Sequence, residues 1–160
     1  MRWRRLLIRA LLLWVLVFLG SMTDSTRVTA ILNYIMATGA PAMPAQPTSW
    51  KLKLMQTMGS NTANGTELTG ATGYTGGGAT MAGWTAATGS TAAISGPIAA
   101  VSWTNGGSAW TAVAGIEIWD TAGTPLRWFQ GALTGGSVTV NGGNTLQFAI
   151  NSISLTGTAW

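Results

Sequence analysis

The chain has 160 residues, no Cys and no His, and 8% of its residues are charged, against about 25% in an ordinary soluble domain. One domain is expected at this length, and the missing residue types exclude disulfides, thiolate metal sites and His-based catalytic sets. Four of the eight basic residues of this net +4 chain lie in the first nine positions, so the remainder is neutral. Because nucleic-acid binding needs clustered cations, we expect no nucleic-acid partner.

The N-terminal segment has a basic start and an uninterrupted apolar run over residues 10–19. Ten helical residues span about 15 Å, half of a hydrocarbon core of about 30 Å. The small residues Gly20 and Ser21 follow, as in a signal peptide. Three interpretations stay open: residues 1–21 are a signal peptide or membrane anchor, a buried or partner-bound helix, or an extended gene start before Met22.

Residues 24–38 predict one amphipathic helix, because their apolar residues recur at helical spacing. Asp24 can cap its start, and Gly39 stands where a left-handed residue ends a helix. Three prolines in the next nine residues predict an extended connector over 40–48. The apolar stripe consists of Val28, Ile31, Leu32, Ile35 and Met36.

From Trp50 onward apolar residues recur at every second position, a pattern typical of short half-buried strands. A long loop over 58–78 interrupts this pattern, and Asn141-Gly142-Gly143 predicts a tight hairpin between 137–140 and 144–150. About eight strands predict a mainly β, antiparallel, jelly-roll-like sandwich over 49–160, preceded by the leader 1–21 and the helix and connector 22–48. The predicted strands are 50–54, 81–86, 98–103, 112–119, 126–133, 137–140, 144–150 and 153–156.

All four acidic residues have structural interpretations. Asp24 caps the helix, and Asp120 opens a turn in which its side chain can bond local backbone. Glu117 is expected to be solvated, because it faces away from Ile116 and Ile118 on the same strand. Nothing in the sequence pairs Glu67 with Asp120 as glycosidase carboxylates, and a calcium site at Glu117 and Asp120 lacks Asp-x-Asp spacing. We therefore predict no enzyme activity, no catalytic residue, no cofactor and no metal.

Tryptophan is unusually frequent, with nine in the chain. Most lie on predicted strands, where core packing is the expected role. Trp110 lies in a predicted loop and Trp160 is the last residue, so these two, with Tyr74 of the Gly-rich loop, are the candidate interface or glycan contacts.

The order of short motifs resembles a family of small tailed-phage proteins, common in phages of actinobacteria and usually labelled tail-fibre or minor tail proteins. The family's Arg two residues after the Tyr is replaced here by Gly76, and a hydrophobic leader is unusual for it, which favours Met22 as the start. The matching residues are the helix 27–36, Pro47-Thr48 before the strand 50–54, Glu67-Leu68-Thr69-Gly70, Gly73-Tyr74, Gly115-Ile116-Glu117-Ile118-Trp119-Asp120, Gly131-Ala132-Leu133, and Val138-Thr139-Val140 through Asn144-Thr145-Leu146.

The resemblance implies a non-enzymatic structural component of a tailed-phage virion. We expect a tail or tail-fibre protein, present in several copies as a homo-oligomer and in contact with other virion proteins. Two alternatives are a capsid decoration protein on the head and a carbohydrate-binding module for host-surface glycans. A third is a secreted or membrane-anchored bacterial surface protein, since a membrane partner is expected only if residues 1–21 are retained.

Overall fold

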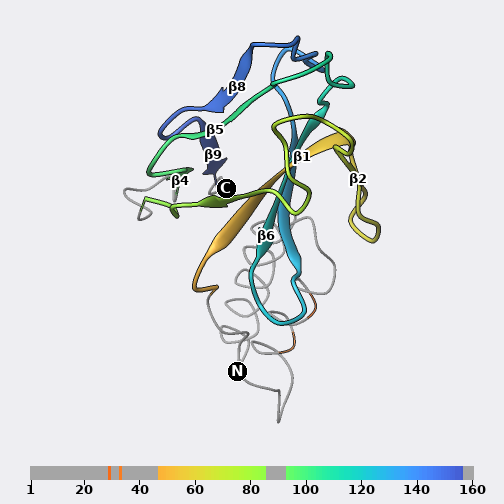
Figure 1. The fold of residues 1–160 in the computed structure, drawn as a ribbon. Coiled ribbons are helices and arrows are strands. Elements are labelled where there is room, and N and C mark those ends of the chain that lie inside the picture. The colour runs from red at the N-terminus through yellow and green to blue at the C-terminus, as the bar shows by residue number, and fades with distance from the viewer. Residues whose placement is uncertain (1–28, 30–32, 34–46, 86–92, 157–160) are drawn as a thin grey trace, which may run out of the picture.

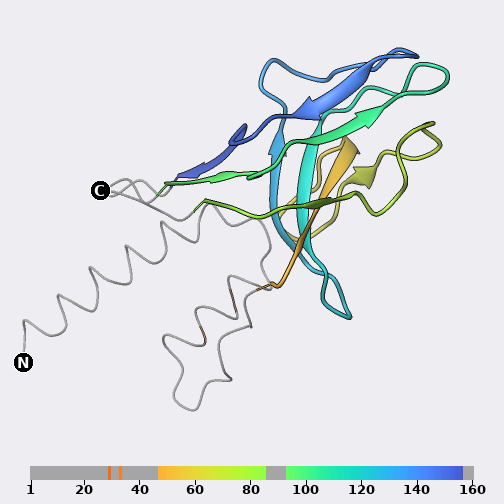
Figure 2. The ribbon, with the colours of Figure 1, turned by 60° about the vertical axis from the view of Figure 1, so that its left-hand side comes forward.

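The structure, a computed structural model, describes Thr29, Asn33 and residues 47–85 and 93–156. The described part is mainly β and antiparallel, in two packed layers, which confirms the predicted fold class (Figures 1 and 2). Its strands are β1 (Trp50–Thr57), β2 (Thr66–Glu67), β3 (Ala79–Met81), β4 (Ala93–Gly96), β5 (Val101–Thr104), β6 (Gly115–Asp120), β7 (Arg127–Ala132), β8 (Thr145–Phe148) and β9 (Ile153–Thr156).

One layer is a five-stranded sheet built around β1. β6 pairs with one side of β1 over six consecutive residues, and β7 pairs with β6. β3 and β2 share the other side of β1, along its first and last residues respectively. The period-two pattern places Leu52 and Leu54 of β1 and Ile118 of β6 on one face, where all three are buried. This face forms half of the core.

The other layer is a two-stranded ribbon, in which β5 pairs with β8 and β4 pairs with β9. The two strand pairs share the same register, but residues 97–100 and 149–152 between them are not paired as strands. Phe148 and Ile153 both pack against the core although they are five positions apart, a spacing that places residues of a regular strand on opposite faces, so the chain changes face at the interruption. Ile98 and Ile150, within the interruption, are exposed by 48% and 58%.

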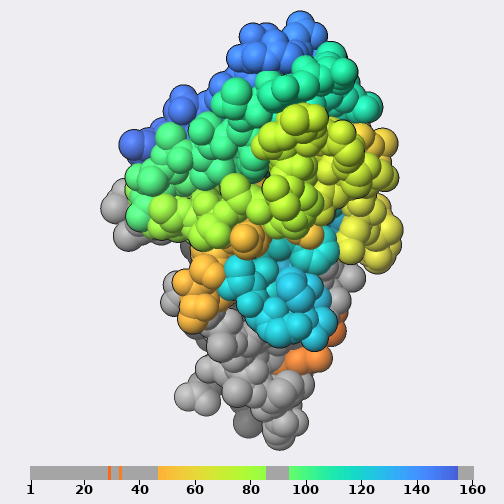
Figure 3. All heavy atoms as spheres, viewed as in Figure 1, coloured from red at the N-terminus to blue at the C-terminus, as the bar shows by residue number. Residues whose placement is uncertain are grey.

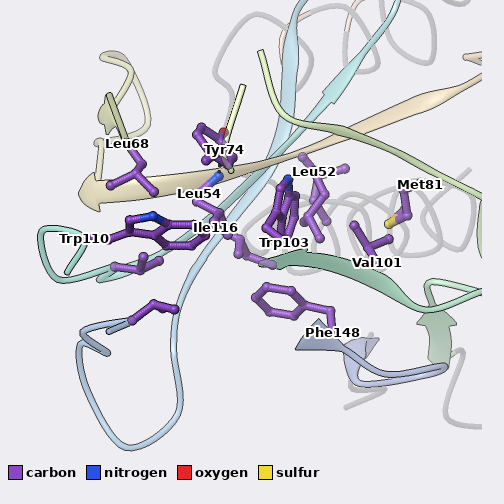
Figure 4. Close-up of a cluster of buried hydrophobic side chains, with 13 residues drawn as sticks. Leu52, Leu54, Leu68, Tyr74, Met81, Val101, Trp103, Trp110, Ile116 and Phe148 are labelled. Carbon is purple, nitrogen blue, oxygen red and sulfur yellow. Dashed lines mark hydrogen bonds between the residues drawn. The ribbon is translucent and has the colours of Figure 1, made fainter. Parts of the chain in front are cut away.

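The core lies between the two layers, and Figure 4 shows side chains of both meeting there. Trp103 and Phe148 of the ribbon pack edge to face, with ring centroids 6.3 Å apart. Loops also contribute, because Leu68 and Tyr74 are buried. In Figure 3 the yellow-green segment that contains these two residues covers the middle of β1. This core joins strands from the whole described length of the chain.

The predicted hairpin over 137–150 is wrong. The turn exists, with Gly143 at φ +82° and a hydrogen bond from Asn144 N to Asn141 O. Its flanks, however, pair with other partners, since Val138 forms a bridge with Val113 and β8 pairs with β5. Long-range burial of the flanking apolar residues therefore outweighs the local hairpin preference.

Three other predicted elements differ from those in the structure. The loop predicted over 58–78 contains the short strand β2. The strand predicted over 81–86 is wrong except at Met81, where β3 ends, because residues 82–85 are not in a strand. The strand predicted over 98–103 begins only at Val101, because residues 98–100 belong to the interruption of the ribbon.

Most of the predicted helix over 24–38, and all of the leader over 1–21, lie outside the described residues. Thr29 and Asn33 are described, and both have helical backbone and are exposed. Among the residues that the structure describes, no helix is long and apolar enough to span a bilayer.

Candidate functional site

Glu117 and Arg127 form a buried ion pair on the face of the sheet that points away from the core. Arg127 Nη1 donates to Glu117 Oε1 at 2.8 Å, and both side chains are 1% exposed. The prediction of a solvated Glu117 is therefore wrong, although its position opposite Ile116 and Ile118 is right. Trp119 Nε1 also donates to Glu117, at 2.9 Å.

The loop 58–65 is what buries this pair. Arg127 donates through Nη1 to Ala63 O at 3.0 Å and through Nη2 to Ser60 O. Glu117 Oε1 accepts from Gly65 N at 2.9 Å. The ion pair thus replaces the backbone partners that an irregular loop lacks, and its role is to fasten the loop to β6 and β7.

Glu67 is the centre of a second polar cluster on the same sheet. Its Oε1 accepts from Tyr74 OH at 2.7 Å and from Gly77 N at 2.6 Å, and its Oε2 lies 3.5 Å from Lys53 Nζ. Tyr74 OH in turn accepts from Leu54 N at 3.1 Å. Burial of the ring, and then the bond to Glu67, raise the pKa of Tyr74 well above its ordinary value.

Asp120 opens the turn after β6 and binds its backbone, as predicted. Its Oδ1 accepts from Leu126 N at 2.9 Å and from Ala122 N at 3.3 Å, and its Oδ2 accepts from Trp128 Nε1 at 2.9 Å. The three described acids therefore bind donors of their own chain, at three different places. Within the described part of the chain, no group of three or more acidic side chains could hold a metal ion.

Two of the three predicted contact residues, Trp110 and Tyr74, are buried. Trp110 is 3% exposed and its Nε1 donates to Thr72 O at 3.0 Å, while Tyr74 is 7% exposed and lies edge-on to Trp110, with ring centroids 6.5 Å apart. Both rings belong to the core, and this burial argues against a contact role for either. Trp160 lies outside the described residues.

A half-buried aromatic cluster lies where β1 begins. Trp50 packs edge to face on Trp128 and Trp84, with ring centroids 5.4 and 6.4 Å apart, and Trp84 does the same with Phe129 at 6.1 Å. Trp119, on the opposite face of the sheet, is covered by Lys53, whose Nζ lies 4.1 Å from the ring centroid. These tryptophans pack on one another or on neighbouring side chains, in agreement with the predicted structural role.

A groove between the sheet and the ribbon is open on the described surface, and no sequence pattern predicted it. We call it the β7–β8 groove; its volume is about 490 Å³. No motif marks it, because its lining comes from segments far apart in the chain. It is lined by Ile116 and Ile118 of β6 and by residues 129–134, 138, 146–148 and 152–154.

The lining of the β7–β8 groove is uncharged and largely apolar. The polar residues of the lining are Gln130, Gln147 and a few with hydroxyl groups, and the Gln130 side chain accepts from Arg127 Nη1 at 3.2 Å on the outer face of the sheet. Gly131 leaves space, since a Cβ added there would meet nothing within 4 Å. The chemistry available is therefore apolar contact with neutral hydrogen bonding, which suits the binding of a partner. The main apolar side chains are Phe129, Leu133, Val138, Leu146, Phe148 and Ile153.

Comparison with known families places the chain among the fibre proteins of phages. The matching family is described as podophage GP4 fiber I protein gp80, and the match covers residues 21–156. The chain belongs to this family, which confirms the resemblance to phage tail-fibre proteins that the motifs indicated. No curated protein matches the chain.

Proposed function

We propose that the protein is a non-enzymatic structural component of the tail or tail fibre of a tailed phage, assembled in several copies. The observation that carries this proposal is the match to a phage fibre family over residues 21–156. The geometry supports it, because the described acidic side chains hold loops and turns in place and the open groove is apolar and uncharged. The expected partners are other copies of the chain and other virion proteins.

The word fibre in the family's description favours the tail over the head. Within the virion, the alternative is that the protein decorates the surface of the capsid. We expect the phage that encodes it to infect an actinobacterium. Glycan binding is a weaker alternative, because Tyr74 and Trp110 are in the core and only Trp160 of the three candidates could still serve it.

Electron microscopy of purified phage particles with gold-labelled antibody against this chain tests the proposal. We expect label at the tail, at several positions per particle. Label confined to the head would replace the tail role by capsid decoration. Particles without label, from lysates in which the antibody detects the chain elsewhere, would contradict a virion role.

A further inference from the structure

We propose that the β7–β8 groove binds an extended, uncharged segment of a second copy of this chain. This inference rests on the proposed function, since it names the surface through which copies assemble.

The groove lies between two strand edges. β7 is the last strand of the five-stranded sheet, and β8 has β5 on one side only within the described part of the chain. Residues 129–132 of β7 and 146–148 of β8 both line the groove. An edge strand presents backbone N–H and C=O groups that a further strand can pair with, so an extended segment is the occupant that such a groove fits.

The charge of the lining restricts the occupant further. None of the lining residues, all of which are described, is charged, so a charged side chain in the groove would lose hydration without gaining a partner. The chain itself is 8% charged, and from residue 22 onward it is a neutral sequence of Thr, Gly and apolar residues. Its own extended segments therefore have the composition that the groove requires.

The size of the apolar surface suits one segment of a partner copy. Fifteen residues line the groove, fewer than the roughly 20–30 per partner of a standard interface. One exposed aliphatic residue extends it, because Ile150 is 58% exposed in the turn between Phe148 and Ser152, which both line the groove. A surface of this size fits a single extended segment rather than a whole flat interface.

Substitution of Gly131 by Leu tests the proposal. A Leu side chain would occupy the groove, and since a Cβ at Gly131 meets nothing within 4 Å the fold should tolerate it. Gly123→Leu is the matched control, because Gly123 has the same free space but lies in the exposed turn after β6. Sedimentation velocity on the full chain should show self-association of the wild type and of Gly123→Leu, and at least about tenfold weaker association of Gly131→Leu.

A second pair of variants guards against a folding defect in Gly131→Leu. Val138→Lys adds a charge at the rim of the groove and keeps both backbone hydrogen bonds to Val113. Ser137→Lys adds the same charge at the exposed neighbouring residue, which does not line the groove. We expect weaker association only for Val138→Lys, with the far-UV circular dichroism of all four variants unchanged.

Two results would overturn the inference. One is a wild-type chain that stays monomeric at every concentration tested, and the other is association that Gly131→Leu and Val138→Lys both leave intact. Either result, combined with gold label on phage tails, would reject the groove as the contact between copies while the proposed function stands. Absence of label from particles would reject the proposed function itself.

Discussion

At the scale of single residues, the ion pair of Glu117 and Arg127 stabilises the sheet through the loop that it holds. Two charges buried in a protein lose much hydration, and they are tolerated here because each also binds the loop backbone. The loop 58–65 shields the pair from water in return. Neither the pair nor the loop would keep this geometry without the other.

Removal of Arg127 should therefore be costly. Arg127→Ala leaves the Glu117 carboxylate buried without its cation, and we expect a loss of about 3–5 kcal/mol in the free energy of unfolding, measured by urea denaturation. Lys53→Ala, which removes the partly exposed pair with Glu67 and the contact with the Trp119 ring, is the control and should cost about 1–2 kcal/mol, because it leaves no charge fully buried. Equal losses for the two variants would contradict the structural role of the buried pair.

Tyr74 should make the stability of the protein sensitive to alkaline pH. Because its pKa is raised in the folded state, Tyr74 ionises first in the unfolded chain. Its contribution to stability is complete below the ordinary tyrosine pKa of about 10 and falls as the pH rises above that value.

Tyr74→Phe tests this pH dependence. The variant removes the acceptor of Leu54 N and should cost about 1–3 kcal/mol near neutral pH. Urea denaturation at several pH values should then show a smaller alkaline loss of stability in the variant than in the wild type. A wild type and a variant with parallel pH profiles above about pH 10 would refute the raised pKa.

At the scale of elements, the sequence predicts strands best where the alternation of apolar and polar residues is long. The alternation around Leu52 and Leu54 predicts β1, and that around Ile116 and Ile118 predicts β6. The environment of Glu117 could not be predicted, because its burial depends on the loop 58–65, some fifty residues earlier in the chain. The groove could not be predicted for the same reason.

Asn105 joins two turns that replace the predicted hairpin. Its side chain is fully buried; Nδ2 donates to Val140 O at 2.7 Å and to Ser108 O at 2.8 Å, and Oδ1 accepts from Gly107 N at 2.9 Å. The bond to Val140 O connects the segment after β5 to residues 138–140, and the other two bonds close the turn over 105–108.

Asn105→Asp should weaken this connection strongly. An aspartate keeps the shape of the side chain but places a second oxygen against the carbonyl groups of Ser108 and Val140, so two bonds become repulsive. We expect a loss of more than about 2 kcal/mol in thermal or urea unfolding. Asn61→Asp, at an exposed position, is the control and should change stability by less than about 0.5 kcal/mol.

At the scale of the whole molecule, the described strands depend on one shared core. Leu52 and Ile118 come from the sheet and Val101 and Phe148 from the ribbon, and all four belong to the same buried cluster. A two-stranded ribbon alone has no second layer to bury its apolar face and is at best marginally stable. The ribbon should therefore be folded only while it is packed on the sheet.

Native-state hydrogen exchange can test this dependence. If the two layers form one cooperative unit, the slowest amides of β5 in the ribbon and of β6 in the sheet should exchange with the same free energy, close to that of global unfolding. Arg127→Ala, which acts on the outer face of the sheet, should then lower both values equally. Faster exchange in β5 than in β6, with β5 unaffected by the substitution, would show instead that the ribbon opens on its own and exposes the β7–β8 groove more widely than the static structure does.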